Sequence, residues 1–270
     1  MNLSNVKMIV SDMDGTLLNS EEEVSTLFFE QFEKLKALNI HFVAASGRQY
    51  NSIAQKLHSI KNEITIVGEN GGVIKKENET LLLQTFEPQK VVELIPTLRQ
   101  IKNTFIILCG ENKAFVESKD PNFIRIFQEY YNAHEIVEDL TSVPQHNPII
   151  KIALYHSESS EQFIYPSVKQ FEDIYLLKIS GKNWLDISNL NSNKGTAVKF
   201  LQEKMNINPE QTMVFGDYLN DLEMLEAATF SFAMKNAHEK VKKTARFITE
   251  NNSNLGVEKI IEQVIKANTN

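Results

Sequence analysis

Short apolar runs alternate with segments of helical periodicity along most of the chain, and this alternation restricts the fold more than any other feature. Runs typical of strands are residues 6–10, 40–45, 64–67 and 212–215. The segments between them carry apolar residues at the three- and four-residue spacing of an amphipathic helix, and the last such segment is 257–265. Such a pattern is typical of a parallel sheet covered by helices. We therefore expect an α/β fold with a Rossmann-like, doubly wound parallel-sheet core.

The middle of the chain differs in composition from both ends. Six of the seven prolines fall there, together with the apolar runs 105–108 and 149–155 and a segment with helical spacing at 91–98. A change of pattern of this kind is typical of a separate folding unit. We therefore predict two domains: a core built from residues 1–83 and 186–270, and an inserted α/β domain of residues 84–185.

Charge and cysteine content exclude several classes of function. The 270 residues include 28 basic and 35 acidic ones, a net charge of −7, without any cluster of lysine and arginine. Nucleic acids and anionic membranes need such a cluster, so we expect neither as a partner. No apolar run is long enough to span a membrane and no signal pattern opens the chain, so we expect a soluble, cytoplasmic protein without an obligate protein partner. The only cysteine, Cys109, lies in an apolar run and is expected to be buried.

A pair of carboxylates follows the first predicted strand, in the segment Asp12-Met13-Asp14-Gly15-Thr16. Side chains two residues apart in an extended chain point the same way, so Asp12 and Asp14 are expected on one side and Met13 on the other. Two carboxylates placed together are candidates for a nucleophile and a general acid/base.

Three further polar segments stand where a strand ends or a helix begins, which is where open α/β sheets place ligand-binding groups. They are Ser46-Gly47-Arg48, Lys194-Gly195 and Gly216-Asp217-Tyr218-Leu219-Asn220-Asp221. A hydroxyl and free backbone N–H groups at the first segment suit a phosphate. Aspartates gathered at the end of a strand suit a hard cation such as Mg²⁺, which prefers carboxylate oxygens.

Together these motifs resemble those of the haloacid dehalogenase-like phosphohydrolases, most closely their Cof-type members of subclass IIB. The matches span nearly the whole chain in the family's order: Asp12 to Thr16, Ser46, Lys194, and Gly216 to Asp221. A subsidiary match is Glu69-Asn70-Gly71-Gly72, in which Gly72 stands where the family commonly has alanine. Only the stretch between Ser46 and Lys194 is long enough to hold an inserted domain. In this family an insertion at that point is a C2-type α/β cap.

The resemblance implies a Mg²⁺-dependent phosphomonoester hydrolase. Asp12 is then the nucleophile that forms an aspartyl-phosphate, and Asp14 is the general acid/base. The metal ligands implied are Asp12, the backbone carbonyl of Asp14, and Asp217. Asp221 has a supporting role, orienting Lys194 or a metal-bound water.

The resemblance also implies a set of phosphate-binding groups. These are the side chains of Ser46, Lys194 and Asn220 and the backbone N–H groups of Met13 and Gly47. The cap would contact the rest of the substrate, a small phosphorylated metabolite. The family favours a sugar phosphate, with pyridoxal phosphate or flavin mononucleotide as alternatives. Lys151 and Lys182 are candidate contacts within the cap because of their charge.

Two other functions use similar residues. A receiver-type phospho-acceptor module also combines acidic residues, a hydroxyl and a lysine, but it needs only about 120 residues and no second domain. It also lacks a carboxylate two residues after the phosphorylated aspartate, so Asp14 favours the enzyme. A phosphomutase or phosphotransferase acting on sugar phosphates stays open as the alternative.

Overall fold

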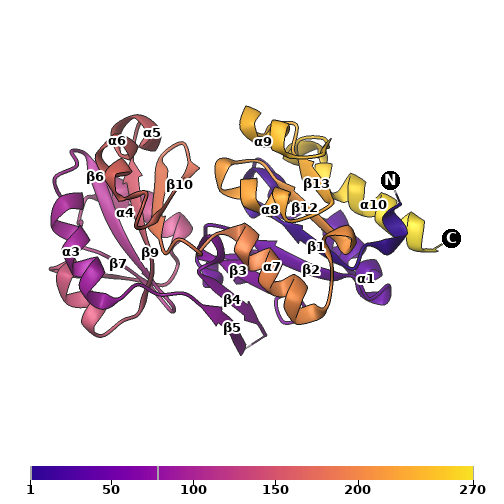
Figure 1. Cartoon of the computed structure of the whole chain (residues 1–270), viewed down its shortest axis with the longest axis horizontal. Coiled ribbons are helices and arrows are strands. Elements are labelled where there is room, and N and C mark those ends of the chain that lie inside the picture. Colours follow the sequence, from indigo (N-terminus) through magenta and orange to yellow (C-terminus); the bar gives the residue numbers. More distant parts are fainter. Residues whose placement is uncertain (1, 78, 270) are drawn as a thin grey trace.

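Two separate sheets organise the protein (Figure 1). The computed structural model describes residues 2–77 and 79–269. In the first sheet, eight strands lie in the order β14-β13-β12-β1-β2-β3-β4-β5. Their bounds are β1 (Met8–Ser11), β2 (His41–Ala45), β3 (Thr65–Gly68), β4 (Val73–Lys76), β5 (Glu79–Leu83), β12 (Thr212–Gly216), β13 (Phe230–Ala233) and β14 (Phe247–Ile248). The strands from β14 to β3 are parallel, whereas β4 and β5 add an antiparallel edge.

Helices bury the apolar strands of this core sheet. They are α1 (Thr26–Ala37), α2 (Tyr50–Lys56), α7 (Lys194–Met205), α8 (Leu222–Glu226), α9 (Glu239–Thr244) and α10 (Gly256–Thr269). In the central strands, Val10 stands opposite Val214 on one side and Val43 on the other, and all three side chains are fully buried. Continuous apolar strands of this kind are expected where both faces of a parallel sheet are covered. The predicted α/β fold is confirmed.

The second sheet contains six strands in the order β10-β11-β9-β6-β7-β8, and only β7 and β8 pair in parallel. The strands are β6 (Thr104–Gly110), β7 (Ala114–Val116), β8 (His134–Ile136), β9 (Ile149–His156), β10 (Leu176–Gly181) and β11 (Trp184–Ser188). The helices beside them are α3 (Pro88–Leu98), α4 (Pro121–Tyr130), α5 (Ser160–Phe163) and α6 (Tyr165–Val168). Along β9, Ile152 and Leu154 join one apolar cluster while Ala153 and Tyr155 join another. Both faces of this sheet are therefore packed. Cys109 is buried in the second cluster, as expected.

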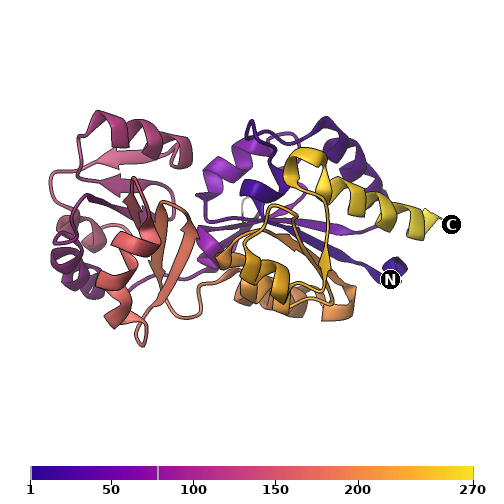
Figure 2. The ribbon, with the colours of Figure 1, turned by 90° about the horizontal axis from the view of Figure 1, so that it is seen from above.

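The second sheet is built from the middle of the chain. Its last strand, β11, ends at Ser188, so the predicted boundary at residue 185 falls within a strand. We call residues 84–188 the inserted segment. Both chain termini lie at the end of the core away from this segment (Figure 2). Among the described residues, no helix has the length and apolar character needed to cross a membrane.

Candidate active site

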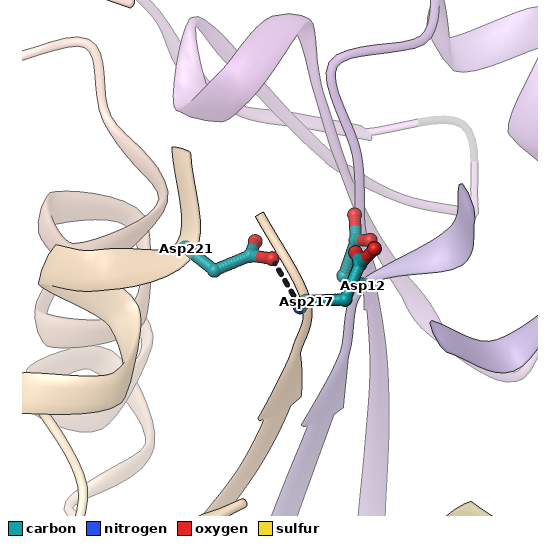
Figure 3. Close-up of side chains that lie close together, drawn as sticks. All are labelled: Asp12, Asp217 and Asp221. Atoms are coloured by element: carbon teal, nitrogen blue, oxygen red, sulfur yellow. Dashed lines mark hydrogen bonds between the residues drawn. The ribbon is translucent and has the colours of Figure 1, made fainter. Parts of the chain in front are cut away.

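Two aspartates meet where the neighbouring strands β1 and β12 end (Figure 3). Asp12 follows β1 directly, and Asp217 follows β12. The turn after Asp12 needs a glycine, because Gly15 has φ +73° and a Cβ there would lie 2.3 Å from Asp217 Oδ2. Thr16 Oγ1 donates a hydrogen bond of 3.3 Å to Asp217 Oδ1. The turn therefore brings the two carboxylates together.

A third carboxylate and one lysine complete this cluster. Asp12, Asp217 and Asp221 each offer an oxygen within 4.8 Å of the others. Lys194, the first residue of α7, is fully buried, and its Nζ lies 2.5 Å from Asp12 Oδ1 and 2.6 Å from Asp221 Oδ1. Asp221 Oδ2 accepts hydrogen bonds from the backbone N–H groups of Asp217 and Tyr218. Both oxygens of Asp221 are thus bound within the protein, which makes it a support for Lys194.

The charge balance of the cluster suits a divalent cation. Burial raises the pKa of Asp12 to about 7, against the opposing effect of Lys194, and burial raises the pKa of Asp217 well above its ordinary value. The pKa of Lys194 is also raised: the carboxylates of Asp12 and Asp221 outweigh the effect of burial. A buried and a half-buried carboxylate that are costly to ionise together, with hard oxygen donors, fit Mg²⁺. Asp12 and Asp217 are therefore the side chains positioned to hold it.

Asp14 lies outside this carboxylate cluster and pairs with Arg48. The Arg48 Nε donates to both Asp14 oxygens, at 3.0 and 2.8 Å, and Nη2 donates at 2.6 Å. Arg48 also donates to the backbone carbonyl of Glu129 in α4, and its guanidinium carbon lies 4.7 Å from the ring centroid of Tyr130. The arginine thus links a candidate acid/base to the inserted segment. Sequence reasoning did not assign it a role, although it follows Ser46-Gly47 directly.

The residues expected to bind phosphate lie around the same strand ends. Ser46 follows β2, and its Oγ accepts from the backbone N–H of Arg48 at 3.0 Å. Asn220 donates to Asn70 Oδ1 at 2.9 Å. Ser46, Gly47 and Asn220 line one cavity together with Asp12, Asp14 and Asp217. The side chain of Met13 is fully buried and does not line the cavity, so only its backbone is available for this role.

The cavity lies between the core and the inserted segment and has a volume of about 340 Å³. The inserted segment contributes Tyr130, Tyr131, Lys151, Lys182 and Trp184 to its lining. Lys151 and Lys182, chosen from the sequence for their charge, therefore both lie at the cavity. The aromatic residues were missed because nothing in their local sequence distinguishes them from core residues.

Lys151 anchors the inserted segment to the core beneath this cavity. Its Nζ donates to the backbone carbonyl of Gly47 at 2.7 Å and lies 2.8 Å from Glu69 Oε2 and 3.4 Å from Asp186 Oδ2. Asp186 accepts in turn from Asn70 at 2.5 Å. Lys151, Glu69 and Asp186 are all buried. The carboxylates outweigh burial and raise the pKa of Lys151, which keeps it charged.

Comparison with known proteins agrees with this architecture. The family model of haloacid dehalogenase-like hydrolases matches residues 9–261. Over 264 residues the chain is 30% identical to the 5-amino-6-(5-phospho-D-ribitylamino)uracil phosphatase YbjI of Escherichia coli (strain K12), covering 97% of each chain. The crystal structure of SMU.1108c from Streptococcus mutans UA159 superposes with a TM-score of 0.90 at 27% identity, covering 97% of this chain and 99% of that one. The subclass IIB sugar phosphatase BT4131 shares the fold, with a TM-score of 0.81 at 21% identity over 96% and 98% of the chains. The protein is therefore an enzyme of the haloacid dehalogenase-like hydrolase family.

Proposed function

We propose that the protein is a Mg²⁺-dependent phosphomonoester hydrolase that acts on a small phosphorylated metabolite through an aspartyl-phosphate at Asp12. The observation that carries this proposal is the placement of Asp12, with Lys194 and Asp217 against it, at the wall of a cavity that Asp14 also lines. A nucleophile, a cation and a second carboxylate are the groups that this reaction needs.

In the first step, an Asp12 oxygen attacks phosphorus and the ester P–O bond breaks. Asp14, in its protonated form, gives its proton to the departing oxygen. In the second step, Asp14 takes a proton from water as the water oxygen attacks the phosphorus of the aspartyl-phosphate. Inorganic phosphate leaves and the Asp12 carboxylate is restored. Arg48 donates to both oxygens of Asp14 and so positions this carboxyl group at the cavity before the substrate enters.

Charge neutralisation is the other requirement, since a carboxylate must approach a phosphate dianion. Mg²⁺ held by the Asp12 and Asp217 carboxylates and the Asp14 carbonyl supplies that neutralisation when bound. Lys194, Ser46 and Asn220 and the backbone N–H groups of Met13 and Gly47 bind the remaining phosphoryl oxygens. Positioning and electrostatics of this kind account for most of the catalysis in phosphoryl transfer.

The inserted segment, as a cap over the strand ends, selects the leaving group. Its residues line the same cavity as Ser46, Gly47 and Asn220, and we expect closure over the substrate to exclude water. A sugar or sugar-alcohol phosphate is the substrate class we propose. The name of the relative YbjI supports the latter, because its substrate carries phosphate on a ribityl chain. A phosphomutase uses the same core chemistry and is the alternative.

The test is a panel of phosphorylated metabolites with Mg²⁺ or with excess EDTA, read as released inorganic phosphate. We expect hydrolysis with Mg²⁺ only, without any bisphosphate activator. The Asp12→Asn variant is the matched control for contaminating phosphatases. Absence of phosphate release from every substrate would contradict the proposal, and isomerised sugar phosphate as the product would favour the mutase.

A further inference from the structure

The only tryptophan of the chain, Trp184, lines the cavity and is held rigidly by other rings. Its ring centroid lies 4.8 Å from that of Tyr155 and 5.1 Å from that of Tyr130, both at steep angles. Tyr130 is fixed in turn by the guanidinium of Arg48. A pre-organised aromatic surface binds a ligand ring without loss of side-chain entropy. Trp184 and Tyr130 are therefore a ready contact for a flat apolar group.

Three polar side chains beside this aromatic surface are already hydrogen-bonded within the protein. Asn183 donates to the backbone carbonyls of His156 and Ser157, both at 2.9 Å. Asp186 accepts from Asn70, and the Tyr131 hydroxyl accepts from the Cys109 thiol. A compact sugar needs a partner for each hydroxyl, because a buried hydroxyl without one is costly. These three side chains are thus less available to the hydroxyl groups of a sugar ring.

One cation beside the aromatic surface remains free. Lys182 is exposed at the tip of the β10–β11 hairpin, lines the cavity, and forms no ion pair within the described residues. The hairpin tip is fixed because the Ser160 hydroxyl lies 3.2 Å from the carbonyl oxygens of both Gly181 and Lys182. A positioned ammonium group suits carbonyl oxygens at the edge of a polar heterocycle.

From these contacts we infer that Trp184 and Tyr130 form a stacking site for a planar unsaturated ring at the far end of the leaving group, with Lys182 at the ring edge. The inference rests on the proposed phosphatase function and refines its substrate class. The substrate would then be a phosphate ester whose alcohol carries a heteroaromatic ring, rather than a bare sugar phosphate.

The first experiment compares two substrates that share a ribityl 5-phosphate and differ in the ring: 5-amino-6-(5-phospho-D-ribitylamino)uracil and ribitol 5-phosphate. We expect kcat/KM to be at least roughly 10-fold higher for the ring-bearing ester, in the range of base–aromatic stacking. Trp184→Leu should remove most of that ratio, whereas Trp184→Phe should keep part of it. Phe163→Leu, which changes an exposed aromatic residue of the inserted segment outside the cavity, is the control and should leave the ratio unchanged.

A second measurement does not depend on turnover or on the folding of a Trp184 variant. Because Trp184 is the only tryptophan, its fluorescence reports on the cavity alone. In Asp12→Asn, the ring-bearing ester should quench this fluorescence in a saturable manner, and ribitol 5-phosphate should change it much less. Equal kcat/KM values for the two esters, or no quenching by either, would overturn the stacking site while leaving phosphatase activity intact. Loss of all hydrolysis with quenching retained would instead contradict the proposed function.

Discussion

Around Asp12, a single lysine faces three carboxylates, and this imbalance affects both catalysis and stability. A carboxyl group whose pKa is raised by folding favours the folded state only while it is protonated. Burial raises the pKa of Asp12 from 3.8 to about 7. In metal-free protein, its contribution to the free energy of unfolding therefore falls as pH rises from about 4 to about 7. Above pH 7 the Asp12 carboxylate is ionised, and its unfavourable effect on folding is at its maximum until a cation binds.

Asp12→Asn should separate these two effects. We expect turnover to fall by about 1,000-fold or more, because an amide cannot act as the nucleophile. In EDTA the variant should gain in melting temperature relative to wild type as pH rises from 5 to 8, since the amide does not ionise. Thermal unfolding at several pH values, with and without Mg²⁺, measures this difference. If the difference in melting temperature stayed constant with pH, folding would not raise the pKa of Asp12 in the metal-free protein.

We expect Arg48 to position Asp14, and substrates with different leaving groups can test this role. Its three hydrogen bonds fix the Asp14 carboxylate, and lysine cannot reproduce that planar geometry. Arg48→Lys should lower kcat by about 10- to 100-fold for alkyl phosphates, whose leaving oxygen needs a proton. It should affect p-nitrophenyl phosphate much less, because nitrophenolate leaves unprotonated. Equal losses for both substrates would assign Arg48 to phosphate binding instead.

At the scale of elements, the strands of the core follow from apolar runs that the sequence shows directly. The run at 40–45 becomes β2, and that at 212–215 becomes β12, each within one residue. Between the runs 40–45 and 64–67, where the spacing is helical, α2 stops at Lys56, and turns carry Leu57 and Ile60 to the core. The amino-acid composition of a strand does not show whether it pairs in parallel or antiparallel with its neighbours. The mostly antiparallel inserted sheet and the antiparallel edge of β4 and β5 could therefore not be predicted.

Gly72 shows how one position limits the packing of β9 against the core. Its backbone is helical, with φ −70° and ψ −24°, so alanine would meet no conformational strain. A Cβ there would, however, lie 2.2 Å from Cγ2 of Ile150. Gly72→Ala should thus cost about 1–3 kcal/mol of stability through overpacking. The branched side chain of Ile150 therefore explains glycine at a position where the resemblance implies alanine.

Leucine at position 150 has no methyl group on its Cβ and should relieve the clash. In a double-mutant cycle by chemical denaturation, Gly72→Ala with Ile150→Leu should be more stable than the sum of the single changes predicts. Additive effects would mean that the backbone, not Ile150, accommodates the new methyl group.

At the scale of the whole molecule, buried polar contacts join the inserted segment to the groups proposed to bind phosphate. Lys151 reaches the Gly47 carbonyl, and Asp186 connects through Asn70 to Asn220. The sequence indicates a separate middle segment. It also indicates that Ser46, Lys194 and Asp217 lie near one another, because each stands where a strand ends or a helix begins. It does not show how the segment docks, because residues 69, 151 and 186 come from different elements and meet only in the folded chain.

Lys151→Met tests this junction, because methionine keeps the length of the side chain and removes the charge. Glu69 and Asp186 are then left buried without their cation, which should cost about 3–5 kcal/mol. Lys178→Met is the matched control: Lys178 in β10 also pairs across to the core, with Glu223, but these side chains are 15% and 35% exposed. Loss of this half-buried pair should cost less than loss of the fully buried one.

Removing one of the two unpaired carboxylates should recover part of the stability that Lys151→Met loses. Burial already raises the pKa of Glu69, so adding Glu69→Gln to Lys151→Met removes a carboxylate that is costly to ionise. Because the Gly47 carbonyl still lacks its donor, the double variant should regain stability but not kcat/KM. Chemical denaturation and phosphate-release assays on the same preparations distinguish the two quantities. If Lys151→Met were no more destabilising than Lys178→Met, the buried network would not hold the inserted segment against the core. If the double variant recovered full activity, the network would act on stability alone, and the Ser46-Gly47 segment would keep its geometry without Lys151.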